Sequence, residues 1–365
     1  MIYTYPDYYE AFHCIAGDCP DTCCAGWQIV INEEALAQYQ KETGPYQPVL
    51  QQRIDWKESV FHQDKAGNCA FLRKDLLCDM YVHLGEESLC RTCREYPRHT
   101  EEFENLREVS LALSCPEAAK LILRKAEPVT FVSRENEEEE FWDDFDAFLF
   151  SVLAEIRVEL INVLQNRELP IRERIRSILK IAGSAMRHYD EGSVVFWDEM
   201  CDEDEVWIED EISFLQEVFA RQYELEYLYA DRESVLKQAE KLLFEREDFA
   251  KQKEAFEQWW KKSNLVPLDI VIEQILVYFI FSYFHGAVYD ENISGKVDAC
   301  AAHAIEIYLM LFAKWLEKGF LTEEDVIFTV YRYSREIENS DENLVLTEEF
   351  DWFHRWEGFE DGFED

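Results

Sequence analysis

Basic residues are scarce in this 365-residue sequence. Lysine and arginine total 36 against 77 aspartates and glutamates, which gives a formal net charge of −41. Because a protein that binds phosphates needs positive charge along a groove, this balance argues against nucleic acid as a partner. The acidic excess lies mostly after residue 130. It forms either a solvated surface or a docking surface for a lysine-rich substrate.

The sequence also lacks the marks of export and of a membrane anchor. Its first ten residues contain no basic leader and no apolar run, so we expect no secretory signal and a reducing, cytoplasmic environment. The longest apolar run, residues 270–284, is interrupted by Glu273 and Gln274. A membrane span needs about 20 apolar residues, so we expect a buried core helix there and no membrane attachment.

Cysteine, by contrast, is abundant and clustered. Nine of the eleven cysteines lie within residues 12–118, at positions Cys14, Cys19, Cys23, Cys24, Cys69, Cys78, Cys90, Cys93 and Cys115. Thiolates are soft ligands that suit zinc or an iron–sulfur cluster, so this spacing favours a metal site. A disulfide framework and reactive, metal-free thiols are the alternatives.

One ion or cluster usually takes four ligands, so the surplus predicts either a second site or buried structural cysteines. Cys201 and Cys300 are isolated and are interpreted as core residues, although Cys201 lies in an acidic stretch that could expose it. His285 and His303 fall on apolar helical faces, which favours core histidines over ligands or bases.

Hydrophobic periodicity divides the chain near residue 130. The first part has strand-like patterns at 27–31 and 108–114, a helix that begins after Asn32 as N-cap, and a second helical piece at 49–61. Cys115 then lies at a strand-to-helix junction, since Pro116 suits a first helical turn.

The second part is helical throughout. Its predicted helices cover residues 141–164, 171–189, 208–229, 233–262, 269–288, 296–318 and 323–337. Thr322 and Asp325 form a capping-box pattern at the start of the last helix. The sequence therefore predicts a mostly α (α+β) protein. A small cysteine-rich N-terminal module with short strands, residues 1–130, packs on a larger acidic helical domain, residues 131–365.

The sequence segments around the cysteines resemble those of a known family. The cysteine order is similar to a zinc- or iron-chelating domain named for its cysteine pattern. The fuller segments resemble the flagellin lysine-N-methylase family over about the first third of the chain. These segments are residues 12–14 (FHC), 19–27 (CPDTCCAGW), 84–98 (LGEESLCRTCREYPR) and 113–118 (LSCPEA).

This resemblance implies a cytoplasmic enzyme that transfers a methyl group from S-adenosylmethionine to lysine side chains of flagellin. It also implies a 4Fe-4S cluster on the cysteines, with zinc as the alternative metal. The implied ligands are Cys14, Cys19, Cys23, Cys24, Cys69, Cys78, Cys90 and Cys93, with Cys115 ranked last.

Two templates for binding the methyl donor are missing. None of the twelve glycines forms a G-x-G, so the nucleotide-cradling loop of Rossmann-like methyltransferases is absent. The C-x3-C-x2-C of radical enzymes that use the same donor would need cysteine where Gly26 stands. We therefore expect the cysteine module to replace a standard donor-binding loop.

The chemistry of the donor suggests residues near the cysteines. Aromatic faces such as Trp27, Tyr81 and Tyr96 could hold a sulfonium, although each could equally be an ordinary core or surface residue. Arginines beside Cys90 and Cys93 could offset cluster charge, bind a donor carboxylate, or form surface ion pairs. The candidate donor-binding residues are Arg94, Tyr96 and Arg98, with Arg91 nearby. The pattern assigns no catalytic base and no oligomeric state.

Two alternatives come from other classes of function. One is a non-catalytic zinc or iron–sulfur module that supports protein interaction or metal handling. The other is an electron-transfer or redox-sensing protein.

Overall fold

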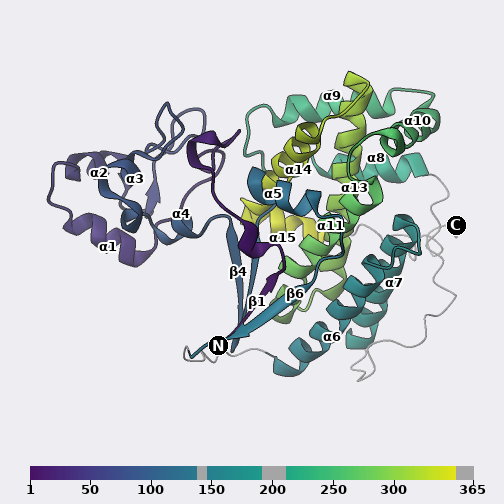
Figure 1. Ribbon diagram of the computed structural model, residues 1–365, viewed down its shortest axis with the longest axis horizontal. Coiled ribbons are helices and arrows are strands. Elements are labelled where there is room, and N and C mark those ends of the chain that lie inside the picture. Colours follow the sequence, from purple (N-terminus) through teal and green to yellow (C-terminus); the bar gives the residue numbers. More distant parts are fainter. Residues whose placement is uncertain (138–145, 191–210, 351–365) are drawn as a thin grey trace, which may run out of the picture.

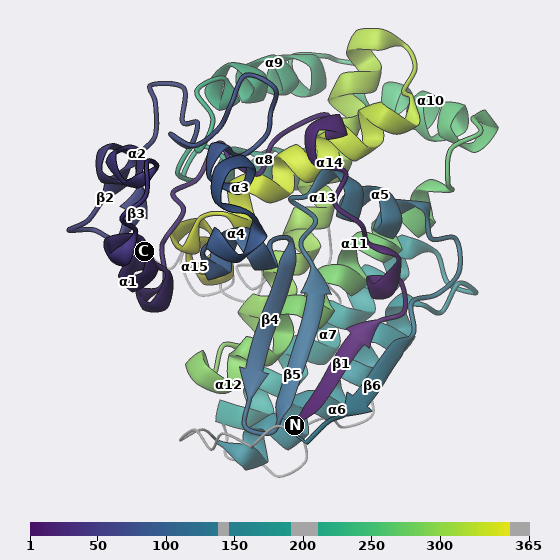
Figure 2. The same cartoon turned by 60° about the vertical axis from the view of Figure 1, so that its left-hand side comes forward.

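The computed structural model describes residues 1–137, 146–190 and 211–350. A four-stranded sheet lies against a large group of helices (Figures 1 and 2). A small lobe projects from the end of the sheet at which strand β4 (Arg98–Phe103) begins. This arrangement confirms the predicted fold class, a mostly α protein with a small part that contains strands.

The sheet has the strand order β4-β5-β1-β6. Its strands are β1 (Ile2–Pro6), β4 (Arg98–Phe103), β5 (Leu106–Leu111) and β6 (Phe131–Glu135). β1 pairs in parallel with β5, with Ile2 opposite Leu106, and antiparallel with β6. β5 is buried almost throughout because helix α11 (Leu268–Tyr283) covers it.

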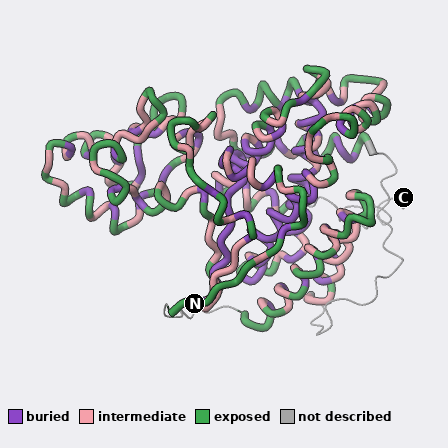
Figure 3. The backbone as a smooth tube through the Cα atoms, in the orientation of Figure 1, coloured by how far each residue is buried: buried purple, intermediate pink, exposed green. Residues whose placement is uncertain are grey.

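The lobe is an insertion between β1 and β4, and we call residues 14–96 the cysteine lobe. It contains α1 (Glu33–Lys41), α2 (Gln47–Arg53), the hairpin β2 (Ile54–Asp55) and β3 (Val60–Phe61), α3 (Asp79–Leu84) and α4 (Arg91–Glu95). Its hydrophobic core is separate from that of the rest of the molecule and includes Tyr39, Leu50, Phe71 and Met80. Figure 3 shows that exposed residues dominate this lobe.

The helical domain is built around α13 (Ile293–Lys318), which contacts most of the other helices. The others are α5 (Pro116–Arg124), α6 (Ala147–Leu164), α7 (Ile171–Asp190), α8 (Glu211–Arg221), α9 (Arg232–Phe244), α10 (Phe249–Lys262), α11, α12 (Ala287–Asp290), α14 (Glu323–Glu338) and α15 (Asp341–Glu349). The buried residues of Figure 3 are concentrated here.

The two hydrophobic cores divide residues 1–130 between them. Tyr8, Phe12 and Phe103 pack into the core of the helical domain, together with residues from α5. The buried residues of the lobe core lie at positions 29–90, and partly buried residues from positions 24–93 pack against them. The module boundary near residue 130 stays a prediction.

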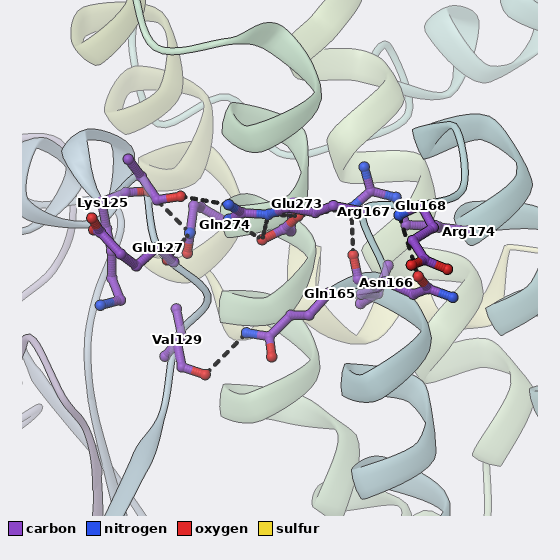
Figure 4. Close-up of polar contacts among 12 residues, drawn as sticks. Lys125, Glu127, Val129, Gln165, Asn166, Arg167, Glu168, Arg174, Glu273 and Gln274 are labelled. Carbon is purple, nitrogen blue, oxygen red and sulfur yellow. Dashed lines mark hydrogen bonds and ion pairs between the residues drawn. The ribbon is translucent and has the colours of Figure 1, made fainter.

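Among the described residues, two helices have the length and apolar composition of membrane spans, namely residues 268–290 and α13. Both are mostly buried inside the protein. The polar residues that interrupt the first one have partners. Glu273 is fully buried and pairs with Arg174 and Arg167, each at 2.7 Å, while Gln274 donates to the carbonyl oxygens of Lys125 and Glu127 (Figure 4). The predicted buried core helix is confirmed.

Several element predictions are confirmed and four need correction. α1 begins after Asn32, and the capping box of Thr322 and Asp325 forms at the start of α14. Residues 27–31 do not form a strand, because only the isolated bridge of Val30 with Val60 pairs their backbone. The piece at 49–61 stops being helical at Arg53, since the chain then turns into the β2–β3 hairpin. The predicted helix at 208–229 ends at Arg221, because residues 222–229 form turns that lead to α9.

The predicted helix at 233–262 is two helices, α9 and α10, separated at residues 245–248. Phe244 and Phe249 pack on each other across this break, with ring centroids 5.8 Å apart. The break therefore lets both helices turn apolar residues toward the same core. Cys201 lies outside the described residues.

Candidate functional site

The lobe brings five of the predicted ligands into one small core. Cys69 donates its backbone N–H to the carbonyl of Cys24 at 2.7 Å, and Cys78 lies in a β-bridge with Leu72. Cys90 is the N-cap residue of α4 and Cys93 lies within that helix. All five cysteines lie in or against the lobe core.

Hydrogen bonds fix α4 against the segment that follows the first cysteines. The Thr92 hydroxyl donates to the carbonyl of Val30 at 3.0 Å, and the Arg91 N–H donates to the Asn32 side chain at 2.8 Å. Ligands that are about 60 residues apart in the sequence therefore share one region because the lobe folds back on itself.

Two pairs of thiols, Cys23 with Cys24 and Cys90 with Cys93, are joined by a hydrogen bond. The pKa of Cys23 falls to about 7 because Cys24 hydrogen-bonds to it, and the pKa of Cys90 falls to about 7 because of Cys93. The pKa values of Cys24 and Cys93 rise correspondingly. Each pair thus supplies one thiolate near neutral pH, which is the form that binds a metal.

Burial keeps four further thiols, those of Cys19, Cys69, Cys78 and Cys115, in the neutral form. Burial raises the pKa of Cys69 to about 11 and that of Cys115 to about 12, and it also raises the pKa values of Cys19 and Cys78. A metal would lower these values by binding the deprotonated form.

The donor set fits a soft metal in its chemistry. The ten cysteines of the described residues are free thiols, and those of Cys24, Cys69 and Cys78 interact electrostatically. Within residues 1–137, 146–190 and 211–350, no three His, Cys, Asp or Glu side chains already stand in a metal-holding arrangement. A metal would therefore have to draw the thiols into a coordination geometry that the described residues of this structure do not contain.

A second group of thiols lies where the lobe meets the helical domain. Cys19 interacts electrostatically with Cys14 and Cys23, and Cys115 interacts with Cys19 and Cys23. Cys14 is exposed, whereas Cys115 is buried at the start of α5. Cys115, ranked last from the sequence, is thus close to two predicted ligands.

Arg335 of α14 joins the segments that carry these thiols. Its Nη1 lies 2.8 Å from Oδ2 of Asp21, and its Nε donates to the carbonyl of Ser114 at 2.8 Å. The carboxylate of Glu338, one turn later, accepts the backbone N–H of Ser114 at 2.7 Å. α14 therefore fixes the strand-to-helix junction that precedes Cys115.

Tyr229 completes this junction. Its hydroxyl accepts a hydrogen bond from Arg335 Nη1 at 3.0 Å, and the guanidinium of Arg332 lies 3.4 Å from its ring centroid. Gly26 packs on the same ring, and a Cβ there would lie 2.6 Å from Cζ of Tyr229. The loop that follows Cys23 and Cys24 is therefore in close contact with the helical domain.

The structure brings together only some of the predicted donor-binding residues. Tyr96 lies 5.7 Å from Trp27 between ring centroids, and its hydroxyl is 3.2 Å from that of Ser114. Arg94 and Arg98 are exposed, and the Arg98 guanidinium lies 5.6 Å from the Phe12 ring centroid. Tyr81 is 48% exposed and Arg91 pairs with Glu95. The arginine beside the thiols is instead Arg335.

The two core histidines are confirmed as such. His285 is buried and lies 3.1 Å from Glu108, which also pairs with Arg157. Burial lowers the pKa of His285 to about 4 and that of His303 to about 3.

His303 belongs to a buried polar network with Tyr333 and Glu306. The Tyr333 hydroxyl lies 2.8 Å from His303 Nδ1 and donates to the Glu306 carboxylate. Burial raises the pKa of Glu306 to about 8. Glu306 is therefore a carboxyl group that can exchange a proton near neutral pH.

Tyr333 also borders a cavity of about 230 Å³ between α9, α13 and α14. Its lining includes Asp231, Glu336 and Arg332, and Arg332 is the residue that stacks on Tyr229. A larger cavity of about 1100 Å³ lies between α7, α10, α11 and α13, with Arg176 and Lys180 among its lining residues. The smaller cavity is the one that adjoins the cysteine junction.

Sequence reasoning missed Asp21, Tyr229, Arg335 and Glu306. One signal was present for Arg335, because a charged residue follows Tyr331 by one turn on an otherwise apolar helix face. Asp21 and Tyr229 carry no such signal, since their roles depend on contacts more than 100 residues away.

Comparison with known proteins adds the family. Residues 157–360 match the FliB lysine N-methylase C-terminal domain, which covers more than half of the chain. The flagellar biosynthetic protein FliU of Salmonella muenchen is 30% identical over 129 residues, which is 33% of this chain and 76% of FliU. No solved structure matches.

Two lysine-N-methylases are similar over a shorter share of their own length. That of Salmonella typhimurium is 32% identical over 130 residues, and that of Salmonella choleraesuis is 31% identical over 128 residues. Each match covers 33% of this chain and about a third of the relative. On the C-terminal domain match, which agrees with the family that the cysteine segments resemble, the chain belongs to the FliB lysine N-methylase family.

Proposed function

We propose that this protein is a cytoplasmic lysine N-methyltransferase that transfers a methyl group from S-adenosylmethionine to lysines of flagellin. The observation that carries the proposal is the family match over residues 157–360, and the names of the lysine-N-methylase relatives support it. The name of the flagellar relative FliU supports a flagellar substrate.

The reaction sets clear requirements. The lone pair of a neutral lysine amine forms the new N–C bond while the C–S bond of the sulfonium breaks, which leaves a neutral thioether. Lysine has an ordinary pKa of about 10.4, so a nearby base must accept its proton.

We place the substrate lysine in the cavity of about 230 Å³ between α9, α13 and α14. Asp231 and Glu336 in its lining offer negative charge to an ammonium, while Arg332 already pairs with Asp231 at 3.1 Å. The Tyr333 hydroxyl would pass the proton to Glu306, whose raised pKa suits a proton acceptor near neutral pH.

The cysteine lobe would hold a 4Fe-4S cluster, with zinc as the alternative. One cluster takes four thiolates, and the candidate ligands are Cys14, Cys19, Cys23, Cys24, Cys69, Cys78, Cys90 and Cys93. In each of the pairs Cys23–Cys24 and Cys90–Cys93, the pKa of one thiol is already lowered. A bound cluster would supply a soft electron-accepting metal centre and cross-link distant segments of the lobe.

The test is methylation of purified flagellin. The protein is purified under anaerobic conditions, analysed for iron, sulfide and zinc, and incubated with flagellin and isotope-labelled S-adenosylmethionine. Mass spectrometry should then locate labelled methyl-lysine. The matched controls are Cys78→Ala, which should abolish metal binding, and Cys300→Ala, which should not.

Metal-replete protein that transfers no label to flagellin would contradict the enzymatic function and favour a non-catalytic metal or redox module. Zinc at stoichiometric amount without iron would contradict the cluster and leave the methyltransferase proposal standing.

A further inference from the structure

Arg335 is the most deeply buried cation at the junction of the cysteine lobe and the helical domain. Its residue is only 1% exposed, although it stands on an amphipathic helix of an acidic protein. Burial alone would lower the pKa of its guanidinium, but Tyr96, Tyr229 and Asp21 raise it, so Arg335 stays charged. Such a buried charge needs several partners to offset its lost hydration.

The guanidinium has partners on only two of its three nitrogens. Nε donates to the Ser114 carbonyl, and Nη1 contacts Asp21 and the Tyr229 hydroxyl. Nη2 is buried and has no hydrogen-bond partner among the described residues. Nη2 is therefore a buried donor that an additional acceptor at this junction would satisfy.

Cysteine sulfur atoms are the acceptors that this junction offers to Nη2 of Arg335. Arg335 interacts electrostatically with Cys19 and Cys23, and Asp21 lies between these two cysteines in the sequence. Its Ser114 contact adjoins Cys115. One arginine from the helical domain therefore reaches both segments that bring thiols to the junction.

We propose that Arg335 is the positioning residue of the cysteine metal centre, giving its free Nη2–H groups to metal-bound sulfur and offsetting the negative charge of the thiolates. The inference rests on the proposed metal centre. Hydrogen bonds to ligand sulfur stabilise the bound metal and raise the reduction potential of an iron–sulfur cluster. Arg335 thereby couples the metal centre to α14, which also borders the proposed lysine cavity.

The chain offers a closely matched control in Arg174. This arginine is 2% exposed, pairs with Glu273, donates to a carbonyl oxygen and has an unpartnered buried nitrogen of its own. Its contacts with Glu273 and with the carbonyl oxygen of Leu164 lie within the helical domain. Replacing it costs stability in the same way without touching a cysteine segment.

The experiment compares Arg335→Gln and Arg335→Lys with Arg174→Gln and Arg174→Lys in the full chain. Metal loss to a chelator is followed for iron or zinc, and the midpoint potential is measured if the metal is iron. We expect Arg335→Gln to lose metal about 10–100-fold faster than wild type and to shift the potential to more negative values. Arg335→Lys keeps the charge, so its rate of metal loss and its potential should lie between those of wild type and Arg335→Gln. The Arg174 variants should match wild type.

Equal rates of metal loss in the Arg335 and Arg174 variants would overturn the inference. If Arg335→Gln does not fold, the two lysine variants decide by the same criterion. Wild-type protein without any metal would instead remove the proposed metal centre itself, so the two failures are distinguishable.

Discussion

Glu306 is a single residue that links stability to pH. Glu306 is 1% exposed, and burial raises the pKa of its carboxyl from 4.5 to about 8 in the folded protein, while the hydrogen bond from Tyr333 and the charge of Arg232 act in the opposite direction. The folded state then binds this proton more tightly than the unfolded state. Its contribution to stability is therefore present below pH 4.5 and is lost as the pH rises toward 8.

We expect Glu306→Gln to remove this dependence. Relative to the variant, wild type should lose about 1.4 kcal/mol of unfolding free energy per pH unit between these two values. Urea unfolding of both proteins at pH 5 and pH 8 measures the difference. Identical pH dependence in the two proteins would show that Glu306 does not titrate in this range.

The same residue tests the proposed proton transfer. A base acts as a carboxylate, so wild-type kcat should rise as the pH passes about 8. Glu306→Gln should lower kcat about 10²–10⁴-fold and lose this rise. The control is Glu317→Gln, because Glu317 is an exposed carboxylate in the lining of the cavity that Tyr333 borders, whereas Glu306 lies behind Tyr333. Equal losses in both variants would argue against Glu306 as the acceptor.

The loop that ends at Gly26 shows how one position ties two elements together. Gly26 has a φ of +86°, and a Cβ there would collide with Tyr229, which is itself fixed by Arg332 and Arg335. Gly85 has a φ of +85° but open space around it. Replacing Gly85 with alanine therefore measures the cost of the backbone conformation alone.

We therefore expect Gly85→Ala to cost about 1 kcal/mol and Gly26→Ala to cost about 2–4 kcal/mol. Hydrogen exchange should show faster opening around residues 19–27 in the second variant alone. Equal losses in thermal stability would mean that the ring of Tyr229 moves aside freely.

Helix α11 depends on one buried ion-pair group. Glu273 is fully buried between Arg167 and Arg174, so Glu273→Ala leaves two cations without their carboxylate and should cost about 3–5 kcal/mol. Glu233 pairs with Lys237 on the surface, and Glu233→Ala should cost about 0.5 kcal/mol or less. Chemical denaturation measures both changes, and a small loss for Glu273→Ala would contradict the assigned role.

At the scale of the whole molecule, the lobe and the helical domain differ in how much hydrophobic core stabilises them. The lobe core is small, whereas the helical domain buries a continuous core around α13. A bound metal would join segments of the lobe that are far apart in the sequence. We expect its removal by a chelator to unfold the lobe locally while the helical domain keeps its protection from hydrogen exchange.

Variants should separate ligands from structural cysteines. Cys78→Ala and Cys93→Ala should each lose the metal, whereas Cys300→Ala should keep it because Cys300 is buried in α13. Metal analysis of the purified variants measures this. Full metal in either of the first two would show that the cysteine pattern was assigned wrongly.

Much of the fold could be predicted from local pattern. The apolar face of α14, the capping box at Thr322 and the Pro116 start of α5 are short-range features, so periodicity and caps reveal them. The hairpin after Arg53 and the break between α9 and α10 were missed. Both depend on which residues meet a distant core, and local propensity does not contain that information.

The sequence alone determined the family resemblance, the helical class and the concentration of thiols, because each is carried by residue type and spacing. Only the tertiary structure decided that Arg335, Asp21, Tyr229 and Ser114 meet beside Cys19, Cys23 and Cys115. These contacts span more than 100 residues and arise because the lobe, the segment before α5 and the segment before α9 all pack on α14. The chemistry of the thiols therefore follows from their spacing, and their electrostatic surroundings follow from the fold.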